Sequence, residues 1–114
     1  MATRYYIRLP EPAKARGSDP DLAFKSEGSE GFAKELEDAL RTTALFDRWK
    51  AKQEEPDDVD QGLAAVDLNS TVTATHHDLY IDLVVVTSLS SSIFKQRLRL
   101  LAGSNWQLSD VKAA

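Results

Sequence analysis

The residues best suited to chemistry lie in the segment 75–94, THHDLYIDLVVVTSLSSSIF, which begins with His76, His77 and Asp78 after one threonine. A histidine side chain can exchange a proton near neutral pH and can bind a metal ion. Neighbouring residues of a strand point to opposite faces, so His76 and His77 cannot bind one ion together. A structural zinc site also needs four donors, and the chain has 2 His and no Cys. We therefore expect no metal and no cofactor here, and we interpret the three residues as a polar turn between two strands.

The same histidines are the candidate acid–base groups of an alternative function. In this alternative, a small-molecule-binding domain or a small enzyme uses His76 or His77, with Tyr80 or Asp82 as the partner. It predicts a concave pocket that contains at least two of these side chains. Histidines exposed at a turn, with no cavity nearby, would contradict it.

Three consecutive serines, Ser90, Ser91 and Ser92, follow the apolar run. The N-terminus of a helix can bind an anion through its free amides. However, the glycine-rich turn and lysine of a phosphate loop are absent, and so is the G-x-S-x-G pattern of a nucleophilic serine. The serines are therefore predicted to cap a helix.

An acidic stretch, EEPDDVDQG, occupies 54–62. A calcium loop that started at Asp58 would need an oxygen ligand at its fifth position and Glu at its twelfth. Gly62 and Asn69 stand there instead. We interpret 54–70 as a solvated acidic linker.

Alternation of apolar and polar residues predicts strands over 4–9, 71–76 and 79–88, and a closing strand over 105–113. Apolar residues at helical spacing predict a helix from Ser29, which we expect to continue to about Gln53 rather than break at the paired threonines. The segment 93–102 fits either a strand or a helix. We favour the helix because Ser90 can cap its start and Gly103 stands just after its end.

The elements then follow the order strand, helix, strand, strand, helix, strand. This order is typical of the ferredoxin-like split βαβ arrangement, an α+β fold with an antiparallel four-stranded sheet and two helices on one face. If 93–102 is a strand, the alternative is a β-meander with one long helix. At 114 residues the chain is predicted to form a single α+β domain over 1–114, with a long surface loop over 10–28 that is a second candidate place for function.

The second face of the predicted sheet is the main candidate site. If Leu79, Ile81, Leu83 and Val85 point at the helices, other side chains are left on the far side. That interaction face consists of Tyr6, Arg8, Tyr80, Asp82, Val84 and Val86. An open apolar face usually marks a binding surface, unless the 10–28 loop or the acidic linker folds across it. We therefore expect a non-enzymatic protein-interaction module whose simplest partner is a second copy, as a homodimer.

Composition argues against several other classes. A net charge of −4 does not suit sequence-independent binding to the phosphate backbone of nucleic acids. The predicted strand segment 79–86, LYIDLVVV, also lacks the basic residue and glycine of an RNA-recognition strand. The longest apolar run, 83–86, is far shorter than the ~20 residues that cross a bilayer. With no Cys and no signal-peptide pattern, we expect a cytoplasmic protein that binds neither nucleic acid nor membrane.

Overall fold

The structure, a computed structural model, describes residues 2–114. Its strands are β1 (Thr3–Leu9), β2 (Thr71–His76), β3 (Ile81–Thr87) and β4 (Gln107–Ala113). Its α-helices are α1 (Ser29–Arg41), α2 (Ala44–Ala51) and α3 (Ser91–Ala102). Three short 3-10 helices complete the chain, namely η1 (Pro12–Lys14), η2 (Pro56–Asp58) and η3 (Gln61–Ala64).

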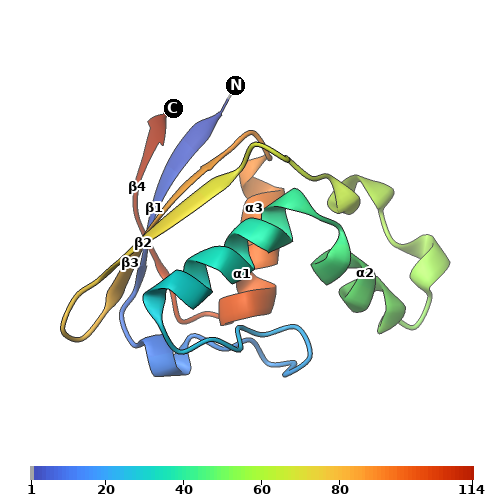
Figure 1. Cartoon of the computed structure of the whole chain (residues 1–114). Coiled ribbons are helices and arrows are strands. Elements are labelled where there is room, and N and C mark those ends of the chain that lie inside the picture. The colour runs from blue at the N-terminus through green and yellow to red at the C-terminus, as the bar shows by residue number, and fades with distance from the viewer. Residues whose placement is uncertain (1) are drawn as a thin grey trace.

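The four strands form one antiparallel sheet in the order β2-β3-β1-β4. The predicted α+β class and four-stranded antiparallel sheet are confirmed, with β1 and β3 in the middle. Residues 2–114 form three α-helices where two were expected. Figure 1 shows the sheet at one end of the molecule and the helices beside it.

The core forms where one face of the central strands meets the helices. Residues alternate between buried and half-buried along β3, so that Ile81, Leu83 and Val85 point inward as predicted. On β1 the Tyr5 ring stacks on Phe94 of α3, with ring centroids 4.4 Å apart. This alternation follows from the two-residue period of a strand, because side chains of one parity share a face. Leu79 is a correction: it is 83% exposed in the turn before β3, not packed under the helices.

The predicted helix from Ser29 to Gln53 is two helices. α1 ends at Arg41, and Thr42 adopts an extended backbone with φ −131° and ψ 165°. The Thr42 hydroxyl donates to the Asp38 carbonyl, and it also accepts from the Ala44 amide at 3.4 Å. Threonine hydroxyls that bond to nearby backbone groups compete with helix continuation, which explains the break at the paired threonines.

The ambiguous segment 93–102 is part of a helix. The Ser90 hydroxyl accepts from the Ile93 amide, and Gly103 has the positive φ of 65° that favours glycine just after a helix. The β-meander alternative is therefore wrong. The spacing of Phe94, Leu98 and Leu101, all buried, is what distinguishes a helix from a strand here.

The 10–28 loop packs against the helices. The amides of Gly17 and Phe24 both donate to the carbonyl of Leu101, at 3.0 and 2.9 Å. A Cβ on Gly17 would overlap the carbonyl oxygen of Leu100, so only glycine allows this close approach. Residues 22–26 of the loop form no strand, and Phe24 is buried in the core.

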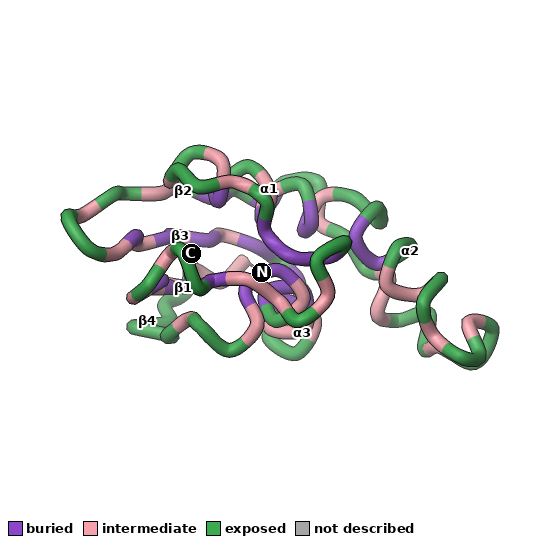
Figure 2. Tube along the Cα trace, turned by 90° about the horizontal axis from the view of Figure 1, so that it is seen from below, coloured by how far each residue is buried: buried purple, intermediate pink, exposed green. Residues whose placement is uncertain are grey.

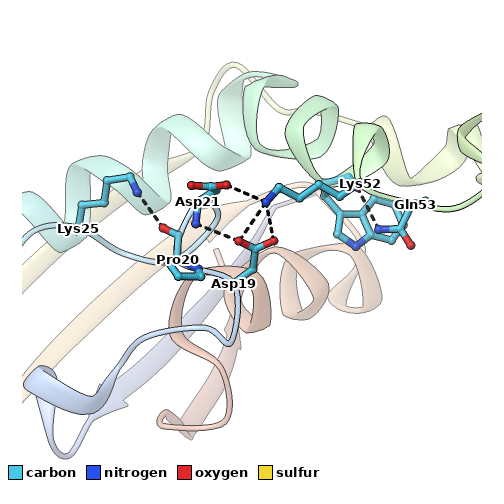
Figure 3. A network of polar contacts seen from close by, with 7 residues as sticks. Asp19, Pro20, Asp21, Lys25, Lys52 and Gln53 are labelled. Carbon is cyan, nitrogen blue, oxygen red and sulfur yellow. Dashed lines mark hydrogen bonds and ion pairs between the residues drawn. The ribbon is translucent and has the colours of Figure 1, made fainter.

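Residues 44–66, comprising α2, η2 and η3, form an arm at the end of the molecule opposite the sheet (Figure 1). Figure 2 shows that the chain after α2 is mostly exposed, whereas buried segments gather between the sheet and the other helices. A lysine joins the arm to the loop (Figure 3): Lys52 Nζ lies 2.9 Å from Asp19 Oδ2 and 2.8 Å from Asp21 Oδ2. The hydrogen bond from Lys52 lowers the pKa of Asp19 below its usual value.

Candidate functional site: the outer face of the sheet

The outer face is the side of the sheet that points away from the helices. The strand register places on it the even-numbered residues of β1 and β3, the odd-numbered residues of β2, and Asp110 and Lys112 of β4. Tyr6, Val84 and Val86 are half-buried there, and the threonines of β2 that neighbour them are exposed. The contacts of the 10–28 loop lie on the helical side, with Leu101 and α1, so this loop does not cover the outer face within residues 2–114.

The outer face is hollowed in the middle. A depression of about 540 Å³ is lined by side chains from all four strands and the β2–β3 turn, among them Tyr6, Arg8, Thr75, His77, Asp82 and Lys112. Its lining mixes aromatic, aliphatic and charged groups. Such a surface can hold a partner side chain or a small molecule, since recognition sites combine apolar area with a few placed polar groups.

One end of the hollow holds a connected polar cluster. Arg8 and Asp82 stand directly opposite on β1 and β3. Arg8 Nε donates to Asp82 Oδ1 at 2.9 Å, and a terminal guanidinium nitrogen donates to Oδ2 at 3.3 Å. His77 Nε2 lies 3.2 Å from the same Oδ2. The Tyr80 ring stacks on the His77 ring at 4.5 Å, and the Arg8 guanidinium lies 4.1 Å from the Tyr80 centroid.

The electrostatics of this cluster favour a charged carboxylate. The hydrogen bond from Arg8 is the main reason that the pKa of Asp82 is lowered, and the charges of Arg8 and His77 add to the effect. The same hydrogen bond raises the pKa of Arg8. Asp82 is therefore ionised near neutral pH and can orient the His77 ring through Nε2.

The structure brings some of the predicted residues together and separates others. His77, in the turn after β2, lies beside Tyr80 and Asp82, and Arg8 binds the same Asp82 carboxylate. His76, the last residue of β2, is exposed and takes no part in this cluster. Val84 and Val86 lie farther along β3, beyond this cluster. No group of three or more His, Cys, Asp or Glu in residues 2–114 is arranged to hold a metal ion.

Sequence reasoning missed two features. Asp110 and Lys112 of β4 border the outer face next to Tyr6 and Arg4, which only the strand register reveals. Arg97 of α3, which the sequence analysis did not select as a candidate, is fully buried. It donates to the carbonyls of Ala39, Leu63 and Ala65 at 2.8, 2.6 and 2.6 Å. Its position three residues after Phe94, on the apolar side of α3, was the signal that could have revealed this.

Comparison with known proteins adds no assignment: no family model, no curated protein and no solved structure matches the chain. Within residues 2–114, α1, α2 and α3 are all too short or too polar to cross a bilayer.

Proposed function

We propose that the chain is a non-enzymatic protein-interaction module that binds its partner through the outer face. The observation that carries this proposal is the exposure of that face. Tyr6, Val84 and Val86 stay half-exposed beside a hollow of about 540 Å³, and the 10–28 loop, one of the two segments that could have covered this face, packs on the helical side. Burial of partly exposed apolar side chains is the main driving force of protein association.

The simplest partner is a second copy of the chain, related by a twofold axis. A twofold contact brings the same surface of both copies together. If that surface carries both positive and negative groups, the positive groups of one copy can face the negative groups of the other. Here Arg8 and Lys112 supply positive charge, and Asp82 and Asp110 supply negative charge. This mixture supports self-complementarity.

Sedimentation of the full chain over a range of concentrations tests this proposal. Val84→Asp places a charge in the middle of the outer face and is expected to lower the associated mass at high micromolar concentration. Val66→Asp is the matched control, because Val66 is an exposed valine of the arm. A parent chain that stays monomeric throughout, or a Val84→Asp chain that associates as the parent does, contradicts the proposal.

The contact between His77 and Asp82 favours a second candidate, a small-molecule site in the hollow. A histidine whose one nitrogen is held by a carboxylate is a common acid–base arrangement. A thermal-shift screen with small acids, bases and sugars tests it in the parent, His77→Ala and His76→Ala. Stabilisation that is lost only in His77→Ala supports a ligand site. The absence of any stabilising compound counts against it.

For the fold, we propose a variant of the ferredoxin-like split βαβ arrangement in which the arm is inserted after α1. The support is the chain order of the elements and the neighbouring positions of β1 and β3 in the sheet. Nuclear Overhauser contacts from Leu36 of α1 and Leu98 of α3 to odd-numbered side chains of β1 and β3 test it. Contacts from α1 to Val84 would contradict it.

A further inference from the structure

β4 is an edge strand that the other elements within residues 2–114 leave uncovered on one side. It pairs with β1 on one side only, and all seven of its residues are exposed. Val111 is 46% exposed and Leu108 is 39% exposed. An edge strand presents unpaired amides and carbonyls, which can pair with another strand.

The register shows which backbone groups point to this free edge. The amide of Ala114 donates to the carbonyl of Ala2 at 3.2 Å, so these two residues form a hydrogen-bonded pair. Hydrogen-bonded and non-hydrogen-bonded pairs alternate along an antiparallel ladder. Lys112 and Asp110 therefore bond to β1, whereas the amides and carbonyls of Val111 and Ala113 point away from it. The outward Val111 amide donates to the carboxylate of its neighbour, Asp110 Oδ1, at 2.8 Å.

We propose that a second copy of the chain pairs with this edge, antiparallel, with Val111 of one copy opposite Val111 of the other. The twofold axis then passes between the two Val111 residues, and each Val111 amide exchanges its bond to Asp110 Oδ1 for one to the partner's Val111 carbonyl. The released Asp110 carboxylate becomes free to face the partner. Asp110 of each copy stands opposite Lys112 of its partner. The two sheets become one continuous sheet, and the contact does not depend on the outer-face proposal.

Charge selects this register over its neighbours. The amides and carbonyls that point outward belong to alternate residues, Val111 and Ala113. An alternative register must therefore still pair residues whose backbone groups point outward. A shift in one direction places Lys112 opposite Lys112, and a shift in the other direction places Asp110 opposite Asp110. Like charges directly opposite destabilise a strand pair, whereas unlike charges stabilise it.

The β-bulge sets the length of the contact. The register between β1 and β4 shifts between Tyr6 and Ile7, which leaves Ser109 as the extra residue of β4. A bulge twists an edge strand and limits further pairing. The new ladder is therefore short, centred on 110–112, and reversible rather than fibre-forming.

Two single charge reversals test the register, and both are made in the Val84→Asp chain because Asp110 and Lys112 also border the outer face. Asp110→Lys and Lys112→Asp each replace two unlike cross-strand pairs by two like pairs, and each should weaken edge association about tenfold or more. Mixed in equal amounts, the two variants again oppose unlike charges and should recover the association of the parent. A mixture that associates no better than either variant alone overturns the proposed register.

A backbone variant separates the edge from the outer face. Val111→Pro removes the outward amide but no bond to β1, because Val111 and Tyr5 form a non-hydrogen-bonded pair. Val111→Thr, which keeps the amide, is the matched control. Circular dichroism of each variant checks that the sheet is intact.

Mass distinguishes the two proposals, since the monomer is 12.6 kDa. The edge twofold is perpendicular to the sheet and a face-to-face twofold lies parallel to it, so both contacts together close a four-chain assembly where the two axes intersect and give a larger assembly where they do not. Val84→Asp should then leave an edge dimer, and Val111→Pro should leave a face dimer. If Val111→Pro has the same mass as Val111→Thr, the edge contact is refuted. If Val84→Asp has the same mass as the parent while Val111→Pro dissociates, only the outer-face contact fails.

Discussion

Replacing Arg97 by methionine should destabilise the fold, because a buried guanidinium holds three carbonyls there. It donates to Ala39 in the last turn of α1, where carbonyls lack a helical partner, and to Leu63 and Ala65 of the arm. Its Nε has no hydrogen-bond partner among residues 2–114, and burial lowers the pKa of the Arg97 guanidinium. Arg97→Met keeps an unbranched apolar side chain of similar length while it removes the charge and all three bonds.

The magnitude is the difference between two opposing effects. Three charge-assisted hydrogen bonds contribute about 2 kcal/mol each, or about 6 kcal/mol. Removal of the guanidinium from water costs several kcal/mol, which we take as about 3 kcal/mol. The expected loss is therefore about 3 kcal/mol of unfolding free energy, or about 10 °C in Tm for a domain of this size.

Urea unfolding followed by tryptophan fluorescence measures this loss, because Trp49 lies in α2 and Trp106 lies just before β4. Arg99→Met is the matched control on the same helix, since Arg99 is exposed and should change stability by less than about 0.5 kcal/mol. An Arg97→Met chain within about 1 kcal/mol of that control would refute the reasoning. It would mean that desolvation of the guanidinium already cancels its bonds.

Three further perturbations test other parts of the fold. Backbone amides hold the pKa of Asp67 at about 2, so its stabilisation of about 1 kcal/mol is fully present above pH ~4 and is lost as the pH falls through about 2. Acid titration of stability should lose this component in Asp67→Asn but keep it in Asp57→Asn; identical acid profiles for the two would contradict the assignment. Gly17→Ala should cost about 2 kcal/mol by chemical denaturation because a Cβ has no room there, whereas Gly28→Ala has open space around it and serves as the control; equal stabilities would mean that the loop is not closely packed. Lys52→Met should leave global stability nearly unchanged, because its ion pairs are exposed, but should speed amide exchange in the 18–26 segment; unchanged exchange rates would show that the lysine does not hold the loop.

Local periodicity in the sequence was sufficient to predict much of the fold. The alternation around Ile81, Leu83 and Val85 identified both the central strand and its inward face. The cap residues favoured a helix over 93–102, which is part of α3 (Ser91–Ala102). The end of α1 was wrong because helix propensity summed over a window does not register two adjacent threonine hydroxyls that bond to the backbone. Leu79 was misplaced because the strand pattern was extended into a turn.

The polar cluster of the candidate site depends on pairing between strands that are distant in sequence. Arg8 and Asp82 are 74 residues apart, and their contact requires a particular register of β1 on β3. Tyr6, Val84 and Val86 could be assigned to one face by parity alone. The choice of His77 over His76 as the neighbour of Asp82, and the bond from Arg8 to Asp82, could not. Register is set by packing of the whole sheet, which a single strand does not encode.

The way the 10–28 loop packs has a practical consequence for handling the protein. Although it has almost no regular structure, the loop contributes Ala15, Leu22 and Phe24 to the core and shares a carbonyl of α3 with two of its amides. We therefore expect proteases to cut, and an inserted epitope tag to be tolerated, at the exposed acidic segment 54–58 of the arm. The 10–28 loop should resist both cleavage and insertion.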